Sequence, residues 1–269
     1  MATSIADAFN LSGRVAVVTG SGRGIGRAIA SRLAEAGAEV VCADIEDSTA
    51  ADTARLIAEA GGSASSRRVN VTSKREVDEL VAETVASHGH VDVMVNNAAI
   101  IVDNTILDTT EEELDRVHAV NFKGVFFGCQ AAGRVMAKQQ SGSIINMASA
   151  AIDTPTPSMA SYATAKAAVA QLSRTLAMEL APLHVRVNAI APGWIDTPMN
   201  ERHARLTDGS LDLGKQRDYV ENRARRYSPM GILGEPDDIA FAALYLASPA
   251  ARFVTGIVMR PNGGSNMPW

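Results

Sequence analysis

Aromatic side chains are scarce in this sequence. Phe, Trp and Tyr make up only 4% of the 269 residues, whereas hydrophobic residues of all kinds make up 46%. A core must therefore be built mainly from Ala, Val, Ile and Leu, which is typical of parallel sheets covered by helices. Long apolar runs are also missing, and the N-terminal stretch lacks an apolar segment, so we expect neither a membrane span nor a secretion signal. No linker-like stretch divides the chain, which favours one domain.

Cysteine, basic charge and metal-ligand patterns are equally sparse. Cys42 and Cys129 lie in a strand-like and a helix-like run, and we expect both to be buried, reduced and inert in a cytoplasmic protein. The formal net charge of −5 provides no footprint for nucleic acid. None of the histidines has ligand spacing with Cys or carboxylate partners, so we predict no metal; they are His88, His90, His118, His184 and His203.

Short apolar runs alternate with helix-like patterns along most of the chain. This alternation predicts right-handed crossovers and an α/β, doubly wound parallel sheet of about seven strands with helices on both faces. In such sheets, ligands bind beyond the carboxyl ends of the strands. The predicted strands are residues 14–19, 39–43, 66–71, 91–96, 143–147, 185–190 and 256–259. The predicted helices are residues 28–36, 49–60, 73–87, 111–138 and 162–180.

A glycine-rich loop, residues 20–26 (GSGRGIG), joins the first predicted strand to the first helix. Glycines at this point let the backbone turn tightly and approach a pyrophosphate, which would lie on the partly positive helix N-terminus. The loop therefore predicts nucleotide binding.

Asp44 ends the second predicted strand, about 20 residues beyond these glycines. Its carboxylate could accept hydrogen bonds from an adenosine ribose and would repel a 2′-phosphate, which favours NAD over NADP. Arg23, inside the glycine loop, could instead attract that phosphate. We rank Asp44 higher because repulsion at close range is hard to compensate. The alternative for Asp44 is a helix N-cap or turn residue.

Tyr162 and Lys166 stand four residues apart at the start of a helix-like run, which places both on one helix face. Lowering a phenol pKa from ~10 to about 7 requires roughly 4 kcal/mol of preferential stabilisation of the phenolate. An ammonium ~4 Å away supplies about that much at an effective dielectric constant of ~20, so the pair could form a general acid/base. The alternative is a solvated helix face. Ser149 favours the catalytic interpretation, because it ends a strand-like run and could bind the same substrate oxygen.

Together these motifs resemble the short-chain dehydrogenase/reductase family, in its single-domain NAD(P)-dependent branch. The glycine motif is residues 19–26, and residues 96–99 (NNAA) resemble a second motif in which the family usually ends in glycine. Residues 192–197 and 262–264 resemble two further motifs. The resemblance implies that residues 1–269 form one NAD(P)-binding Rossmann domain with a substrate-lid insertion at about residues 194–227.

The resemblance also implies roles for individual residues. Tyr162 would be the acid/base, Lys166 would lower its pKa and hold the nicotinamide ribose, Ser149 would orient the substrate oxygen, and Asn121 would bind a water that links Lys166 to solvent. Thr197 and the backbone of Ile195 would hold the carboxamide, and Asn70 would meet the adenine, although the family usually has aspartate there. The full set of implied cofactor contacts is Gly20, Arg23, Gly24, Ile25, Gly26, Asp44, Ile45, Asn70, Val71, Asn97, Ala98, Ala99, Tyr162, Lys166, Pro192, Gly193, Ile195 and Thr197.

Substrate specificity should reside in residues 100–102, 152–159 and 194–227. The first two stretches are apolar or weakly polar, which suggests a neutral, partly hydrophobic secondary alcohol or ketone. The third contains residues 200–214, which are too long for a simple turn and predict a lid. Predicted substrate contacts are Ser149, Ile101, Met159 and Trp194. Four nearby cations could recognise an anionic acyl carrier or coenzyme A, but we favour a solvated face or subunit contact for them; they are Arg217, Arg223, Arg225 and Arg226.

The leading hypothesis is an NAD-dependent alcohol dehydrogenase or ketone reductase. The alternatives are an NADPH-dependent 3-oxoacyl thioester reductase of the acyl-carrier-protein type, which Asp44 disfavours, and a non-catalytic nucleotide-binding scaffold, which would not need all four catalytic residues. The resemblance implies a homotetramer. The acidic triplet at residues 111–113 predicts only a helix start, since carboxylates are favoured there by the helix dipole.

Overall fold

Seven parallel strands form the centre of the computed structural model, in the order β3-β2-β1-β4-β5-β6-β7. The structure describes residues 4–199, 210–212, 214–215, 218, 221–222 and 226–267. The strands are β1 (Val15–Thr19), β2 (Glu39–Asp44), β3 (Ser63–Arg68), β4 (Val93–Asn96), β5 (Gly142–Met147), β6 (Val185–Ile190) and β7 (Val258–Met259). This arrangement confirms the predicted α/β fold class.

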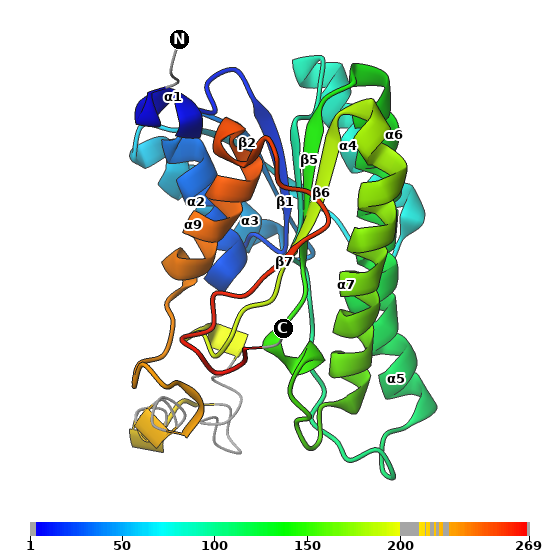
Figure 1. Ribbon diagram of the computed structural model, residues 1–269, viewed down its shortest axis with the longest axis vertical. Coiled ribbons are helices and arrows are strands. Elements are labelled where there is room, and N and C mark those ends of the chain that lie inside the picture. Colours follow the sequence, from blue (N-terminus) through cyan, green and yellow to red (C-terminus); the bar gives the residue numbers. More distant parts are fainter. Residues whose placement is uncertain are drawn as a thin grey trace.

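Helices cover both faces of the sheet (Figure 1). On one face lie α2 (Gly24–Glu35), α3 (Asp47–Glu59) and α9 (Pro236–Ala247). On the other lie α4 (Lys74–His88), α6 (Val125–Gln139) and α7 (Ala160–Leu180). The shorter elements are α1 (Ile5–Phe9), α5 (Glu111–His118), η1 (Ala119–Gly124), η2 (Ala150–Ile152), η3 (Ala181–Leu183) and η5 (Pro249–Ala251). Because helices shield both faces, the central strands are mostly apolar, and every residue of β1 is buried.

The third strand begins and ends earlier than predicted. The apolar residues Val69 and Val71 suggested a strand at 66–71, but β3 is the polar segment Ser63–Arg68. It pairs with β2 in a register that joins Ser63 to Glu39 and Arg68 to Asp44. As an edge strand it is mostly exposed, so pairing with its neighbour decides its bounds and no apolar pattern marks them.

The long helix predicted at residues 111–138 is interrupted. Helix α5 passes into the π-helical segment η1, and α6 continues from there. In a π-helix the hydrogen bonds skip one residue more than in an α-helix, and such segments often occur at functional sites. Asn121 lies inside this segment and is completely buried.

The strand order reverses at β1, because β1 lies between β2 and β4. A crevice is therefore expected beyond the carboxyl ends of β1 and β4. The loops after β5 and the start of α7 gather at this end, and the C-terminus reaches it as well (Figure 1).

Candidate active site

A pocket of about 210 Å³ opens at the carboxyl ends of β4, β5 and β6. It takes its walls from the first turn of α2, from the loops after these three strands, from α7, from Tyr227 and from Ser265 near the C-terminus. The lining residues are Ile25, Asn97, Ala99, Ile101, Met147, Ala148, Ser149, Ala150, Ala151, Thr154, Pro155, Thr156, Pro157, Met159, Tyr162, Lys166, Pro192, Gly193, Trp194, Ile195, Thr197, Met199, Tyr227 and Ser265. Thirteen residues predicted for catalysis, cofactor or substrate are among them: Ile25, Asn97, Ala99, Ile101, Ser149, Met159, Tyr162, Lys166, Pro192, Gly193, Trp194, Ile195 and Thr197.

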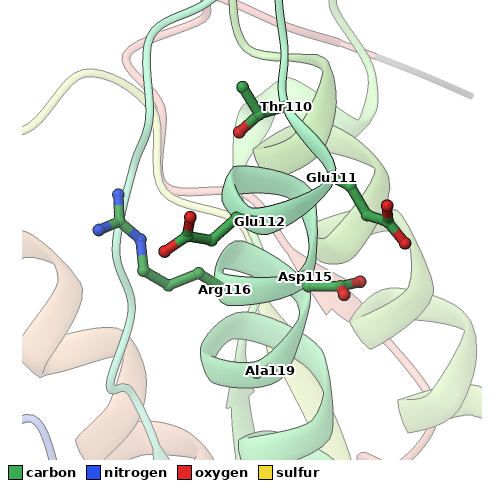
Figure 2. A pocket seen from close by; sticks show the side chains of 6 residues that line it. All are labelled: Thr110, Glu111, Glu112, Asp115, Arg116 and Ala119. Carbon is green, nitrogen blue, oxygen red and sulfur yellow. The ribbon is translucent and has the colours of Figure 1, made fainter.

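A larger but shallow depression lies on the surface of α5 and has a different character. Figure 2 shows the side chains of Glu111, Glu112, Asp115 and Arg116 projecting from the first turns of this helix, and all four are exposed. The Thr110 side chain accepts from the backbone N–H of Glu113, whose carboxylate in turn accepts from the backbone N–H of Thr110. This capping box and the dipole account for the acidic residues, in agreement with the predicted helix start.

The glycine loop is held against the end of β4 at contact distance. Gly20 has a φ of +64°, and a β-carbon there would lie 2.7 Å from Cα of Ala98. At Gly26, in the first turn of α2, a β-carbon would lie 2.0 Å from the carbonyl oxygen of Gly20. Both positions therefore exclude any side chain, Gly20 through conformation and contact, and Gly26 through contact alone.

Asn97 ties this loop to β4. Its Nδ2 donates to the carbonyl oxygens of Thr19 at 3.1 Å and Gly20 at 2.9 Å, while its backbone N–H donates to Oγ1 of Thr19 at 3.0 Å. Asn97 was predicted as a cofactor contact, and it lines the pocket. The two hydrogen bonds that its side chain donates also fix the shape of the loop.

The N-terminus of α2 lacks a side-chain cap. Arg23 occupies the N-cap position without a capping hydrogen bond, whereas Ser73 caps α4 and Thr110 caps α5. The first backbone N–H groups of a helix carry partial positive charge and need partners. Glycines that admit no side chain, next to an uncapped helix start, match the requirements of a pyrophosphate, so the residues present fit a dinucleotide.

Asp44 stands at the end of β2, where its carboxylate contacts the glycine loop. Oδ2 accepts from the backbone N–H of Gly22 at 2.9 Å, and Oδ1 accepts from the backbone N–H of Glu46 at 3.1 Å. Asp44 is therefore a turn residue, as one alternative proposed, but the N-cap of α3 is Glu46. Each carboxylate oxygen retains acceptor capacity, which keeps it available to a ribose diol. Arg23 and Ile45 are exposed beside it.

Asn70 uses its side chain locally. Its Oδ1 accepts from the backbone N–H of Thr72 at 3.0 Å and from Oγ1 of Thr72 at 2.8 Å. These two donors occupy both lone pairs of the amide oxygen. The expected hydrogen bond from an adenine amino group to this oxygen therefore has no acceptor site in this arrangement, and an adenine contact would have to use the Asn70 amide nitrogen or the neighbouring Val71.

Tyr162 and Lys166 occupy one face of the first two turns of α7, and both are buried, with exposed fractions of 8% and 1%. Nζ of Lys166 lies 5.7 Å from the centre of the Tyr162 ring and donates to the carbonyl oxygen of Met147 at 2.7 Å. Desolvation by burial lowers the pKa of Lys166 to about 7. The Lys166 amine therefore loses its proton far more easily than an exposed lysine does.

Ser149 follows β5 and starts the short helix η2. Its Oγ accepts from the backbone N–H of Ala151 at 3.2 Å, and its side chain lines the pocket with Tyr162. A serine that caps a helical turn has a defined side-chain orientation. The structure therefore brings the predicted hydroxyl, phenol and amine to one cavity.

The side chain of Asn121 has a structural role that accounts for an asparagine inside a helix. Its Oδ1 accepts from the backbone N–H of Ile100 and its Nδ2 donates to the carbonyl oxygen of Ile100, both at 2.8 Å. This pair of bonds holds the loop after β4, from which Ile101 enters the pocket wall. The predicted water-binding role would have to use other atoms of Asn121 or its remaining hydrogen-bonding capacity.

A buried polar cluster that sequence reasoning missed joins β4 and β5 to α6 and α7. Nδ2 of Asn96 donates to Oδ1 of Asn146 at 2.8 Å, and Nδ2 of Asn146 donates to Oγ of Ser173 at 2.9 Å. Cys129 joins the cluster by donating to Oδ1 of Asn146 at 3.4 Å. Both Cys129 and Cys42 are free and buried, as predicted, and burial raises the pKa of each thiol to about 12.

The substrate side of the pocket carries an aromatic pair. The rings of Trp194 and Tyr227 lie with centroids 5.4 Å apart at 32°, and the Arg226 guanidinium lies 5.3 Å from the centre of the Tyr227 ring. Much of the predicted lid, at residues 200–209 and 213, lies outside the described residues, as do Arg217, Arg223 and Arg225. Ser265 was not predicted; the only sequence signal near it is the Asn-Gly-Gly turn at residues 262–264.

Comparisons with known proteins agree with this geometry. The sequence matches the family described as Enoyl-(Acyl carrier protein) reductase over residues 20–266. It is 39% identical to 3beta-hydroxysteroid dehydrogenase 1 of Eggerthella lenta, over 96% of this chain and 95% of that protein. It is 36% identical to the 3-oxoacyl-[acyl-carrier-protein] reductase FabG of Thermotoga maritima, over 95% of this chain and 99% of that protein. The crystal structure of a short-chain type dehydrogenase/reductase from Mycobacterium marinum has a TM-score of 0.89 at 35% identity and covers 98% of this chain and 100% of its own. The chain belongs to the short-chain dehydrogenase/reductase family.

Membership of the short-chain dehydrogenase/reductase family confirms the predicted resemblance and makes the protein an oxidoreductase that acts on CH–OH or keto groups with NAD(P). None of the helices in the described residues is long and apolar enough to cross a membrane. Within the same residues, no group of three or more His, Cys, Asp and Glu side chains could hold a metal ion.

Proposed function

We propose that the protein is an NAD-dependent oxidoreductase that transfers a hydride between a neutral secondary alcohol or ketone and nicotinamide, with Tyr162 as the general acid/base. The observation that carries this proposal is the common burial of Tyr162 and Lys166 in one cavity with Ser149. That cavity adjoins a helix start that is uncapped and glycine-lined, which is the other half of a dinucleotide site.

The proton and the hydride are handled by different groups. When bound, nicotinamide supplies the hydride chemistry. During oxidation the Tyr162 phenolate removes the proton of the substrate hydroxyl, and during reduction the phenol returns it to the carbonyl oxygen. Ser149 orients that oxygen by hydrogen bonding, since its hydroxyl lies on the same pocket wall. A uniform orientation matters because proton and hydride transfer each require a defined geometry.

Lys166 and Asn121 support this chemistry. Because the pKa of Lys166 is lowered to about 7, a small change in its surroundings is enough to protonate it fully. A nearby negative charge would do so, and the resulting ammonium would stabilise the phenolate of Tyr162. We assign Lys166 to this role and to the nicotinamide ribose, and Asn121 to the loop at Ile100 and to a water between Lys166 and solvent.

The cofactor we propose is NAD, with NADP as the less favoured dinucleotide. Asp44 presents a carboxylate beside Gly22, where a 2′-phosphate would meet a like charge. We assign the remaining cofactor contacts to the glycine loop, to residues 97–99 and to Pro192, Gly193, Ile195 and Thr197.

A neutral substrate fits the pocket lining. Among the described lining residues, Lys166 is the only charged side chain, and Ile101, Met159 and Trp194 provide apolar contacts. Uncharged apolar surfaces accept uncharged apolar molecules, since a buried unpaired charge is costly. The name of the Eggerthella lenta relative, a hydroxysteroid dehydrogenase, points to the same class of substrate.

The second candidate is reduction of a 3-oxoacyl thioester. The name of the Thermotoga maritima relative favours it, and so does the exposed Arg226 over the Tyr227 ring, which could attract an anionic carrier near the pocket. A rise in KM with ionic strength for acyl thioesters would support this reaction, whereas a salt-independent KM would argue against it. The non-catalytic scaffold is least favoured, because all four predicted catalytic residues are present.

We also propose a cytoplasmic homotetramer. Two buried free thiols are in keeping with a reducing compartment. Large apolar side chains are exposed on two separate regions, Leu114, Phe126 and Met178 on α5, α6 and α7, and Phe241 on α9, as two kinds of subunit contact would require. Sedimentation of the purified protein tests this state, and a stable monomer would refute it.

The proposed function is tested by fluorescence titration with NADH and NADPH, followed by a panel of secondary alcohols with the preferred oxidised cofactor. NADH should bind more tightly than NADPH. In Asp44→Asn, which keeps an amide oxygen for Gly22, the preference should move toward NADPH by about tenfold or more, since a repulsive charge is removed. Asp47→Asn, an exposed charge change at the start of α3, is the matched control. Binding of neither nucleotide would refute the dinucleotide site.

A further inference from the structure

Two buried side-chain polar atoms lack a hydrogen-bonding partner within the described residues, and one belongs to the pocket. They are NH1 of Arg186 and Oγ of Ser265. Arg186 still approaches the carbonyl oxygens of Ala247 and Ser248 through NH2, both at 3.4 Å. Ser265 has only its one hydroxyl, and the residue is one of those that line the pocket. Buried hydroxyls are nearly always paired, so an orphan on a ligand pocket wall calls for a partner that the ligand supplies.

The hydroxyl is not needed to shape its own turn. The backbone N–H of Ser265 donates to the carbonyl oxygen of Asn262 at 3.1 Å. The Asn262 side chain accepts from the backbone N–H of Gly264 at 2.9 Å and donates to the carbonyl oxygen of Asn266 at 2.7 Å. Gly263 has a φ of +60°, and a β-carbon there would lie 2.6 Å from Oγ of Ser228. Backbone and asparagine bonds thus fix the turn, and Ser265 Oγ takes no part in them.

The turn is also fastened to the loop that carries the substrate side of the pocket. Arg260 donates from Nε and NH2 to the two carboxylate oxygens of Asp153, at 2.7 and 3.2 Å. Nδ2 of Asn266 donates to Oγ1 of Thr154, another pocket residue, at 2.5 Å. Ser265 is therefore presented from an anchored position, which lowers the entropic cost of a hydrogen bond to a ligand.

We propose that Ser265 determines specificity by hydrogen bonding to a second, uncharged oxygen of the substrate. The preferred substrates would be apolar ketones or alcohols that carry another hydroxyl or carbonyl group away from the reacting carbon. The inference rests on the proposed function, in which the first oxygen meets Ser149 and Tyr162. A hydroxyl both donates and accepts, so that of Ser265 can pair with either a hydroxyl or a carbonyl group of the substrate. The apolar surface between the two polar positions suits a compact hydrocarbon skeleton.

The test uses hydroxyketones of increasing size, from 4-hydroxycyclohexanone to 6-hydroxy-2-decalone, each paired with the ketone that lacks the hydroxyl. The wild-type enzyme should favour the hydroxylated member of at least one pair by about tenfold in kcat/KM, the effect of one hydrogen bond. Ser265→Ala should abolish that preference, because kcat/KM should fall for the hydroxylated ketone and much less for the plain ketone. Ser265→Thr, which keeps a hydroxyl, should retain the preference, and Ser66→Ala on the exposed strand β3 should behave as wild type.

The contrary results distinguish failure of the specificity proposal from failure of the proposed function. An equal loss for both members of a pair in Ser265→Ala would show a structural role and overturn the proposal. So would an active wild-type enzyme with no preference in any pair. If the wild-type enzyme reduces no ketone with either NADH or NADPH, the proposed function fails first, and the specificity proposal fails with it.

Discussion

The two sides of the pocket are built differently. On the glycine side, the contacts involve main-chain atoms of the loop: Gly20 approaches Ala98, Gly26 approaches Gly20, and the Asn97 side chain donates to the carbonyl oxygen of Gly20. On the substrate side, bonds between side chains join separate loops, as Arg260 does with Asp153. Contacts of the loop backbone depend on the sequence of one short motif. Contacts between side chains of separate loops can be changed by single substitutions. The difference teaches that a common nucleotide site can be kept while the substrate site varies.

The largest effect is expected from removing the group that transfers the proton, without altering either side of the pocket. Tyr162→Phe deletes the phenolic hydroxyl while keeping the ring beside Lys166. Turnover should fall by about 10³-fold or more, because no group remains to transfer the proton. Steady-state assays with the best alcohol measure this loss. A fluorescence titration should show NADH binding within about threefold of wild type, since a catalytic hydroxyl contributes little to uniform binding.

Tyr245→Phe is the matched control for this substitution, because Tyr245 lies on α9 away from the pocket lining. It should leave turnover unchanged. Full activity in Tyr162→Phe would end the assignment of Tyr162 as acid/base.

The next largest effect is expected from a substitution that disturbs only the glycine side of the pocket. In Gly26→Ala the new methyl group would lie 2.0 Å from the carbonyl oxygen of Gly20. The loop must shift, at a cost of about 2–3 kcal/mol in the free energy of unfolding, and NADH affinity should fall with it. Urea unfolding and NADH titration measure the two losses.

Gly133→Ala provides the control within helix α6. A β-carbon there would lie 3.4 Å from Cδ1 of Leu180, which is ordinary contact. Replacing glycine by alanine inside a helix should stabilise the protein by up to about 1 kcal/mol. Equal destabilisation by both substitutions would contradict the special role of the glycine loop.

The buried amine of Lys166 makes stability depend on pH. Its pKa falls from 10.5 to about 7 on folding. Between these values the unfolded chain binds more protons than the folded chain, so stability should rise with pH. The free energy of unfolding of the wild type, relative to Lys166→Met, should increase by up to about 1.4 kcal/mol per pH unit above pH 7. Urea unfolding of both proteins from pH 7 to 8.5 measures the difference, and a flat or falling difference would show that the amine stays charged in the fold.

The smallest effect is expected from weakening a contact between loops on the substrate side of the pocket. Asp153→Asn weakens the pairing with Arg260 but keeps one amide oxygen as acceptor. The free energy of unfolding should drop by less than about 1 kcal/mol, as for other partly exposed ion pairs. KM for the alcohol should rise while KM for NAD stays constant, which steady-state kinetics can resolve. A matching rise in both constants would mean that the two sides are not independent.

Most of the α/β order and most of the pocket residues could be predicted from the sequence. The glycine loop, Asp44, Ser149, Tyr162 and Lys166 belong to short motifs at strand ends, and the parallel topology brings those ends together. The π-helical segment at Asn121 could not be predicted, because the Asn121 side chain in it bonds to Ile100, which lies in a loop about 20 residues earlier in the chain. The bounds of β3 were also missed, since its partner strand decides them.

By itself, the sequence determined the fold class and the family, because apolar periodicity and strand-end motifs are local patterns. Only the tertiary structure decided how charged Lys166 is, since burial in the assembled core controls its pKa. It also decided that Ser265, which belongs to no recognised motif, joins the wall of the pocket. Desolvation and long-range contact arise from packing the whole chain, and no local stretch of residues carries that information.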